Sequence, residues 1–404
     1  MPTVTLRSPI LPQMLVGSVP VRRSGVPRFW ASLWLDIIKG SLEPSTKKRH
    51  ALALDRLYQA AERQRGSDCL DRLLADVEID AIESVLVGFL AELRNEATIN
   101  GIDRSSMWAT ALSFVTDILH HGGTSAGAQA HRIEARLLRL DTMYSRLAPN
   151  PVRAAPPIRA LPPAVIEDLY AIFNPSSHRN PFKTDALRWR NLLIFMLLLR
   201  LGLRRGEAAL LVANSIKDDV DPGTGQTVVW LDVEETQDDD PRYEEPGLKT
   251  GPSRRQLPVP KELVLLTDTY LENYRGRTHY PYLFMSQKGR PLSVRAMNEV
   301  FEAATRALSA PARKSLAKQG LSSVSCHDLR HTCAVVRMRR YQDSGDHLDR
   351  ATERLRRFFG WSPQSQMPRL YAKAYFETKL SEVWEEQFDD FTDALRRTLS
   401  QDEP

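Results

Sequence analysis

His327-Asp328-Leu329-Arg330-His331-Thr332 is the stretch around which this chain of 404 residues is organised. On a helix, positions three and four residues apart share a face, so His327, Arg330 and His331 are expected to point the same way. A guanidinium fork beside an imidazole suits an oxyanion such as phosphate. Two histidines four residues apart also occur in zinc sites, but an arginine beside them disfavours a bound cation. A solvated helix terminus remains the third interpretation of these six residues.

Length and charge limit what the rest of the chain can be. A chain of 404 residues is longer than a single domain usually is, so two or three domains are expected. Its 42% apolar residues are enough to build a hydrophobic core in each. Residues 311–375 hold 13 Lys and Arg against 5 Asp and Glu, whereas residues 26–147 hold 15 against 16. The basic surplus therefore surrounds the His327 segment, which permits a polyanionic partner there.

Cysteine usage and hydropathy predict a cytoplasmic protein. Cys69, Cys326 and Cys333 cannot all pair and lack metal-type spacing, so reduced thiols are expected. Prolines interrupt the apolar residues near the N-terminus, which disfavours a signal peptide. The most apolar run, Leu192 to Leu203, is only 12 residues long and includes Arg200, so it predicts a buried core helix and not a membrane span.

Hydrophobic spacing divides the chain into four parts. Residues 1–25 lack periodicity and predict a flexible arm. Residues 26–147 carry apolar residues at helical spacing in four or five segments, which predicts a small helical domain. Six prolines within residues 148–163 exclude a helix and indicate an extended linker. Residues 164–397 then form the second folded part.

After the linker, the hydrophobic pattern includes stretches that alternate with a period of two residues, as strands do, beside stretches with helical spacing. Helices are predicted on both sides of two short strands, Thr227–Val233 and Arg255–Val259. An acidic run between the strands, from Glu234 to Glu245, is expected to be a solvated surface insertion. The predicted fold class is therefore mainly α with a small β-sheet.

Three further motifs accompany the His327 segment. They are Gly-Leu-Arg-x-x-Glu at 202–207, Lys249-Thr250-Gly251, and Gly360-Trp361 followed by Tyr371 ten residues later. Gly202 and Gly206 permit a sharp helix exit and close backbone approach. Taken alone, that motif also fits a helix C-terminus with arginines near the negative end of the dipole. The four motifs in this order, behind a helical domain and a linker, resemble the tyrosine recombinase family of phage-integrase type over roughly residues 26 to 395.

The resemblance implies a fold and an assembly. It implies an N-terminal helical, SAM-like core-binding domain over 26–147 and an α+β tyrosine recombinase catalytic domain over 164–397, together forming a C-shaped clamp on double-stranded DNA. The apolar stripe from Leu380 to Leu395 would be a C-terminal helix. It would dock in a neighbouring protomer of a homotetramer on paired DNA sites, or close its own domain; both interpretations stay open. A cytoplasmic, nucleoid-associated protein is implied, with no membrane partner.

The resemblance also implies roles for the residues around the phosphate. Arg204 and Arg330 would clamp the non-bridging oxygens of a DNA phosphodiester. His327 would donate to the same phosphate or move the proton of the nucleophile. Glu207 and His331 would support these residues without reacting.

Proton transfer and attack would fall to the remaining motifs. Lys249 resembles the general acid of the family, and Lys288 is the alternative. Trp361 would supply an indole N–H donor. Tyr371 would be the nucleophile, because its distance from Trp361 is close to the interval of the family and because basic residues bracket it; Tyr375 is the alternative.

The implied function is site-specific DNA recombination of integrase or transposon type. The chain would cleave and rejoin DNA through a covalent 3′-phosphotyrosyl bond, with no metal, cofactor or ATP. A type IB-like DNA topoisomerase would share this chemistry without exchanging partners. A non-catalytic DNA-binding relative should have lost at least one motif, and a zinc peptidase built on His327 and His331 would require a metal.

Overall fold

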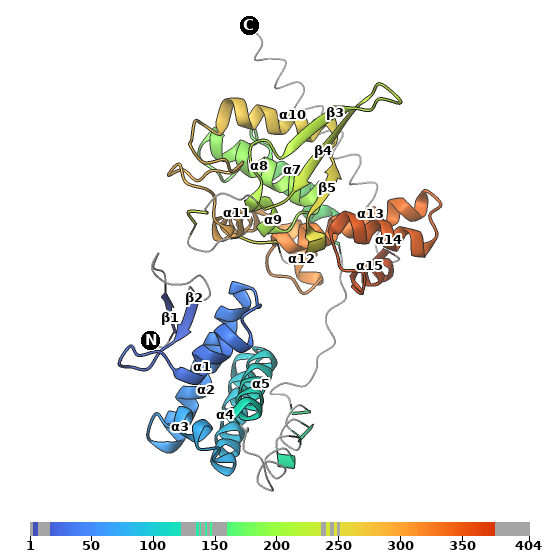
Figure 1. The fold of residues 1–404 in the computed structure, drawn as a ribbon. Helices are drawn as coiled ribbons and strands as arrows, with labels where there is room; N and C mark the ends of the chain where they lie inside the picture. The colour runs from blue at the N-terminus through green and yellow to red at the C-terminus, as the bar shows by residue number, and fades with distance from the viewer. Residues whose placement is uncertain are drawn as a thin grey trace. The chain divides into compact units, whose positions relative to one another are not determined.

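The structure, a computed structural model, describes residues 3–6, 17–122, 160–235, 240–242, 246–248 and 251–375, with isolated positions between 135 and 147. The chain divides into two compact units, residues 1–155 and 156–404 (Figure 1). The division falls within the proline-rich segment. The described residues are mostly helical with two small antiparallel sheets, which confirms the predicted fold class.

The first unit is a helical bundle preceded by a β-hairpin. Its elements are β1 (Thr3–Leu6), β2 (Gly17–Pro20), α1 (Phe29–Leu33), the π-helix η2 (Trp34–Ile38), α2 (Pro44–Arg65), α3 (Leu70–Ala75), α4 (Ile79–Asn100) and α5 (Ser105–Gly122). Trp34, Tyr58 and Phe114 are fully buried in its core. The indole Nε1 of Trp34 donates to Asp117 at 2.8 Å and the hydroxyl of Tyr58 donates to Asp71 at 2.5 Å, so both polar tips are satisfied inside the bundle.

The N-terminal segment differs from the flexible arm that the sequence predicts. β1 and β2 pair antiparallel, and β2 contacts α2. Val19 and Val21 are both 5% exposed, and Arg22 pairs with Asp71 at 3.3 Å. A strand of four residues offers too few alternating positions for a period of two to stand out in the sequence, so the local pattern does not reveal it.

The second unit contains the remaining elements. They are α7 (Pro163–Phe173), α8 (Asp185–Arg200), α9 (Arg205–Leu210), β3 (Ile216–Val220), β4 (Thr227–Val233), the 3-10 turn η3 (Gly251–Ser253), β5 (Arg255–Pro258), α10 (Lys261–Thr269), the π-helix η4 (Tyr270–Tyr274), α11 (Val294–Ala307), α12 (Ala310–Lys318), α13 (Cys326–Asp343), α14 (Leu348–Phe359) and α15 (Met367–Tyr375).

The apolar run predicted to be a core helix lies in α8. Residues 192–199 are each at most 1% exposed, and α7, α9, α10 and α13 all contact this helix. A helix that is apolar all round must be covered on every side, as this one is. The Thr184 side chain caps its start by accepting from the N–H of Leu187 at 3.3 Å. No helix in the described ranges is long and apolar enough to cross a membrane.

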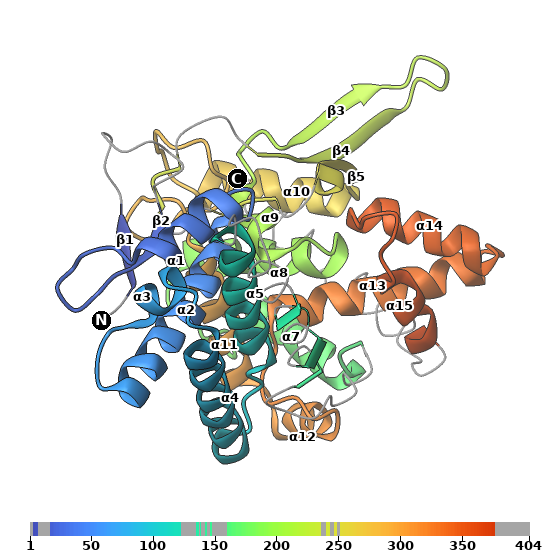
Figure 2. The same ribbon diagram turned by 60° about the horizontal axis from the view of Figure 1, so that its bottom comes forward.

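The sheet of the second unit has the order β3-β4-β5, and all its strands are antiparallel. The predicted strands correspond to β4 and β5. β3 follows no alternating pattern, because its residues after Ile216 are exposed at the sheet edge, where charges discourage pairing with other chains. The β3–β4 hairpin projects away from the helices in both views (Figure 1 and Figure 2).

The acidic run between β4 and β5 is not wholly a solvated insertion. Of its described residues, Asp240 pairs with Arg242 at 2.6 Å, and Arg242 is only 6% exposed. The Arg242 guanidinium also donates to the backbone oxygens of Ala209 at 2.8 Å and Leu292 at 3.0 Å. A buried guanidinium needs such acceptors and a counter-charge, so this part of the run anchors the connection onto α9.

Candidate active site

The chain leaves α8 through a sharp turn at Gly202. The φ angle of Gly202 is +60°, and a Cβ atom there would lie 2.4 Å from the Phe359 ring, so a side chain would be both strained and blocked. The prediction for Gly206 is wrong: this residue lies within α9, and a Cβ atom would meet nothing nearer than the Gly247 oxygen at 3.6 Å. The turn places Arg204 at the N-terminal end of α9.

Glu207 is the carboxylate on which three arginines converge. It is 2% exposed. Its Oε1 accepts from Nη1 of Arg204 at 2.6 Å and from Nη1 of Arg255 at 3.1 Å, while Oε2 accepts from Nη2 of Arg255 at 3.0 Å. Nη1 of Arg330 lies 3.7 Å from Oε2. One negative charge therefore faces three positive charges, and the cluster carries a surplus of two.

These arginines also set the ionisation of Glu207. Burial by itself would raise the pKa of this carboxyl, but the charges of Arg255, Arg330 and Arg204, with the hydrogen bonds of Arg255, outweigh burial and lower the pKa to about 2. Glu207 is therefore ionised at any pH at which the protein would work, and it serves as a fixed counter-charge.

Glu207→Gln should destabilise the second unit by about 3–5 kcal/mol, because a neutral amide leaves buried guanidiniums without their counter-charge. The folded pKa lies below the ordinary value of 4.5, so this stabilisation is complete above pH 4.5 and is lost as the pH falls toward 2. Urea unfolding at pH 7 and pH 3 measures both effects.

The wild type should lose more stability than the Glu207→Gln variant between those two pH values, and equal losses would contradict the low pKa. Glu299→Gln is the matched control, since Glu299 makes an exposed ion pair with Arg295 at 3.2 Å. The loss of this ion pair should change the free energy of unfolding by less than about 1 kcal/mol.

Arg330 joins two distant segments behind this carboxylate. Its side chain is buried, and its guanidinium donates to the backbone oxygen of Gly202 and, at 2.7 Å, to that of Phe359. The guanidinium carbon lies 4.8 Å from the centre of the Phe359 ring and 5.6 Å from that of Trp361. Burial lowers the pKa of Arg330 to about 9, so it stays charged at neutral pH. Counting acceptors among the described residues, two of its five N–H donors bind carbonyls, which leaves donors for an anion.

A cleft of about 450 Å³ opens beside the arginines. Arg204, Arg205, Asn298, His327 and Arg330 are among the residues that line it. These side chains come from the start of α9, from α11 and from the first turns of α13. Three arginines against the single carboxylate of Glu207 make the cleft basic, and His327 in its lining is exposed to solvent.

A capping box fixes the start of α13. The Ser325 hydroxyl accepts from the N–H of Asp328 at 3.3 Å, and the Asp328 carboxylate accepts from the N–H of Ser325 at 2.8 Å. The cap places His327 in the first turn of the helix and Arg330 in the second, which is how the sequence brings both to the cleft.

Tyr371 reaches α13 from α15. It is 1% exposed, and its ring stacks on Trp361 with centroids 5.3 Å apart and planes at 11°. Its hydroxyl lies 2.5 Å from Nδ1 of His331, and the His331 ring meets the His327 ring at 4.1 Å. Burial raises the pKa of Tyr371, against the opposing charge of Arg330. The structure thus gathers Arg204, Glu207, His327, Arg330, His331, Trp361 and Tyr371 in one place.

Sequence comparison decides the family. The sequence profile of the Phage integrase family matches residues 159–375, which is more than half of the chain. The chain belongs to this family. It is therefore a tyrosine site-specific recombinase, an enzyme, and the resemblance inferred from the four motifs is confirmed.

Solved structures of tyrosine recombinases are similar to this recombinase. The alignment with XerA recombinase covers 93% of this chain and 98% of that one, with 15% identity and a TM-score of 0.34. The alignment with XerH site-specific recombinase in its pre-cleavage complex with difH covers 85% of this chain and 92% of that one, with 16% identity and a TM-score of 0.39. The alignment with lambda integrase (residues 75–356) bound to DNA covers 87% of this chain and 98% of that one, with 14% identity and a TM-score of 0.43. Among curated proteins, none matches.

Some predicted parts of the recombinase site lie outside the described residues. These are Lys249, the side chain of Tyr375, and everything after residue 375, including the predicted C-terminal helix. Lys288, the alternative to Lys249, is exposed in a turn that borders a different pocket and does not line the cleft.

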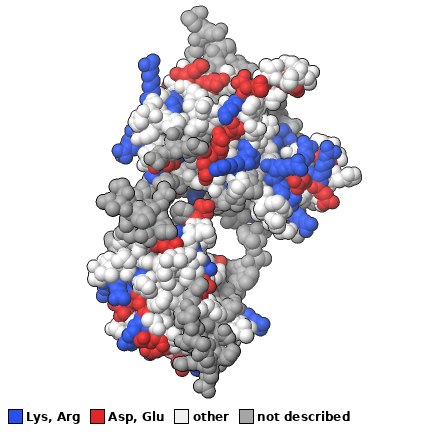
Figure 3. Space-filling view, in the orientation of Figure 1, with Lys and Arg blue, Asp and Glu red and all other residues white. Residues whose placement is uncertain are grey.

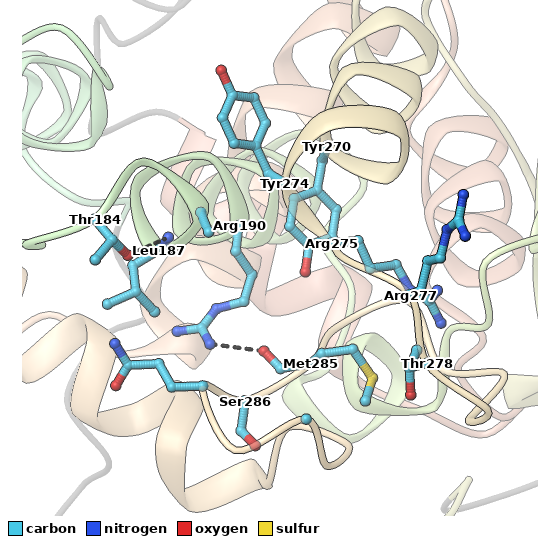
Figure 4. A pocket seen from close by; sticks show the side chains of 13 residues that line it. Thr184, Leu187, Arg190, Tyr270, Tyr274, Arg275, Arg277, Thr278, Met285 and Ser286 are labelled. Carbon is cyan, nitrogen blue, oxygen red and sulfur yellow. Dashed lines mark hydrogen bonds between the residues drawn. The ribbon is translucent and has the colours of Figure 1, made fainter.

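That second pocket, of about 250 Å³, lies between α8, η4 and the loop around Met285 (Figure 4). Arg190 reaches from α8 to donate to the Met285 oxygen at 2.9 Å, and Nε of Arg275 donates to the Tyr282 oxygen at 3.1 Å. The two buried or half-buried arginines are thus bonded to loop carbonyls, and none of the predicted site residues lines this pocket.

The histidine pair lacks the surroundings of a zinc site. Nδ1 of His331 is occupied by the Tyr371 hydroxyl. Within the ranges that the structure describes, no three of His, Cys, Asp and Glu converge as metal ligands.

Arg255 is the site residue that the sequence reasoning missed. Besides its two bonds to Glu207, it donates from Nε to the Phe358 oxygen at 2.7 Å, and its side chain is 6% exposed. The alternation of β5 contains the missing signal. Arg255 lies two residues before Leu257, which is 1% exposed, so both side chains point to the buried face, where an arginine requires a carboxylate partner.

Proposed function

We propose that this recombinase cleaves and rejoins double-stranded DNA through a covalent 3′-phosphotyrosyl intermediate, without a metal ion, cofactor or ATP. The observation that carries this proposal is the convergence of Arg204, Arg255 and Arg330 on Glu207, beside a cleft and in the same cluster as Tyr371. A surplus of two positive charges suits a phosphodiester whose negative charge grows during attack.

Four side chains would hold that phosphate. Arg204 and Arg330 line the cleft and would each donate to a non-bridging oxygen. His327, on the exposed rim of the same cleft, would donate to the phosphate or move the proton of the nucleophile. Trp361 would add its indole N–H beside Arg330.

The reaction then needs one bond to form and one to break. The phenolic oxygen of Tyr371 gives its proton to His327 and forms a bond to phosphorus, and the bond from phosphorus to the 5′-oxygen breaks. The leaving 5′-oxygen takes a proton from Lys249. The phosphotyrosyl ester keeps the energy of the phosphodiester, so the 5′-hydroxyl of a second strand can attack it and reseal the DNA without ATP.

The charged surface supports a DNA partner. Lys and Arg side chains crowd the face over α13 and α14 (Figure 3). Four arginines of α14, Arg350, Arg354, Arg356 and Arg357, share two carboxylates in their ion pairs, Asp346 and Glu353. The remaining positive charge favours contacts with the phosphate backbone. Membership of the family further supports action as a homotetramer on paired sites, with the C-terminal segment as the expected contact between protomers.

Strand exchange tests the proposed function. Two DNA molecules of different length, each carrying flanking DNA of the protein's own locus, are incubated with the protein in EDTA, and joined products are sequenced. We expect junctions between the two molecules. Relaxation of a supercoiled plasmid without exchange would favour the topoisomerase alternative, and binding without cleavage would favour a non-catalytic relative.

Lys249→Ala should slow cleavage of an ordinary substrate by on the order of a hundredfold, because general acid catalysis commonly contributes that much. A bridging 5′-phosphorothiolate should restore the rate, since its leaving group needs no proton. Single-turnover cleavage of the two substrates measures this. Lys288→Ala is the matched control and should cleave both normally; if Lys288→Ala shows the defect and the rescue instead, the acid is Lys288.

A further inference from the structure

The hydroxyl of Tyr371 does not reach the cleft in which the phosphate would bind. The cleft is lined by residues at α9, α11 and the start of α13 and by Gly247 of the connection between β4 and β5, and neither Tyr371 nor His331 belongs to its lining. Tyr371 is instead 1% exposed, stacked on Trp361 and bonded to His331, whose ring contacts the cleft-lining His327. The phenolic oxygen must therefore move before it can attack a phosphate held by Arg204.

One contact fixes the hydroxyl in this place. Nδ1 of His331 lies 2.5 Å from the Tyr371 oxygen, across 40 residues of sequence. His331 is itself held by the His327 ring, which meets it edge-to-face with centroids 4.1 Å apart. The two histidines therefore face different groups: His327 lines the cleft, and His331 binds the tyrosine behind it.

We propose that His331 is a positioning residue that holds the Tyr371 hydroxyl in a resting place behind the cleft and releases it when attack begins. This inference rests on the proposed function, which makes Tyr371 the nucleophile.

The ionisation of both partners agrees with a resting state. Burial, with help from the charges of His327 and Arg330, lowers the pKa of His331 to about 4. Burial also raises the pKa of Tyr371. At neutral pH the phenol therefore donates and the unprotonated Nδ1 accepts, which assigns the ring proton of His331 to Nε2. A neutral phenol is a poor nucleophile, so attack requires both its release from His331 and the loss of its proton, which the proposed function assigns to His327.

The hold has a kinetic consequence. A contact present before the reaction and absent when the oxygen attacks phosphorus stabilises only the starting state. Removing one such hydrogen bond should speed cleavage by on the order of fivefold, if DNA binding is unchanged. A general base in the same place would behave in the opposite way, because its loss slows cleavage by a hundredfold or more.

Chemical protection of Tyr371 tests the hold without any reaction on DNA. N-acetylimidazole acetylates accessible tyrosine hydroxyls, and peptide mass spectrometry of the full chain gives the extent at each tyrosine. We expect Tyr371 to be protected in the wild type and in His331→Asn, whose amide oxygen replaces Nδ1 as acceptor. In His331→Leu the hydroxyl loses its partner, so the ring can leave its stack on Trp361 and reach solvent while the unit stays folded, and its acetylation should rise on the order of tenfold. Unchanged protection there would overturn the proposal.

Internal controls show whether a variant is folded. Tyr170 and Tyr270 are 3% and 1% exposed in the same unit, so both stay unreactive while it is folded. If they react in His331→Leu, that variant is unfolded, and His331→Phe replaces it, because phenylalanine keeps a ring against His327 and lacks the acceptor. Increased acetylation of Tyr371 in His331→Phe then supports the proposal, and unchanged protection overturns it. His178→Leu, at an exposed histidine, is the matched control and should leave Tyr371 protected.

Cleavage rates separate this inference from the proposed function. With saturating suicide substrate, His331→Leu should cleave about fivefold faster than the wild type with equal DNA affinity. A hundredfold loss of cleavage would make His331 the base and overturn the hold. If even the wild type forms no adduct, the proposed function fails, while the protection of Tyr371 still decides whether His331 holds the hydroxyl.

Discussion

Tyr371→Phe is expected to bind DNA with the affinity of the wild type and to form no covalent complex. The variant keeps the ring that stacks on Trp361 and loses only the attacking oxygen, so the fold should persist while cleavage falls by on the order of 10⁴-fold or more. A suicide substrate that traps the cleaved strand, followed by denaturing electrophoresis, measures the adduct.

Tyr375→Phe is the matched control for this prediction. Tyr375 ends α15, four residues after Tyr371, and the sequence alone leaves it as the alternative nucleophile. We expect the Tyr375→Phe variant to form the adduct normally. An adduct that persists in Tyr371→Phe and disappears in Tyr375→Phe would move the nucleophile to Tyr375.

Arg204→Ala should reduce single-turnover cleavage by a hundredfold or more, by analogy with the loss of one donor to a developing oxyanion. Its effect on folding should be small, because Arg255 and Arg330 would still neutralise Glu207. Arg205→Ala is the matched control, since Arg205 also lines the cleft and, within the described part of the chain, donates to Asn298 alone, at 3.2 Å. It should lose less than about tenfold, and near-normal cleavage by Arg204→Ala would remove Arg204 from the site.

Arg330→Ala should lose cleavage to a similar degree, but the structure makes its result harder to interpret. Its guanidinium ties the Gly202 turn to the end of α14 through two backbone oxygens, so the substitution removes a phosphate donor and a structural link together. Arg204, whose side chain is 22% exposed, separates the two effects better.

The parts of the fold that the sequence predicts are those encoded by local pattern. The run from Leu192 is apolar in every direction, and only a helix covered on all sides can bury it. The alternation of Thr227–Val233 gives β4 its bounds. The three-residue and four-residue spacings around His327 bring His327 and Arg330 to one cleft because the capped helix begins one residue earlier.

What the sequence does not predict depends on contacts between distant segments. Glu207 can be seen to support Arg204 three residues away, but the third cation, Arg255, comes from a strand whose register on β4 sets its position. The bond between His331 and Tyr371 depends on how α15 packs against α13, and no local period encodes that packing. The contact behind the proposed hold on Tyr371 is therefore found only in the folded unit.

The most direct test of cleavage by Tyr371 is to find the atom that carries the DNA. The protein is incubated in EDTA with a suicide substrate, digested with a protease, and examined by mass spectrometry for peptides that carry a nucleotide. We expect a 3′-linked nucleotide on the peptide containing Tyr371, at the position of that residue. An adduct on another residue, or cleavage that appears only when a divalent ion is added, would contradict it.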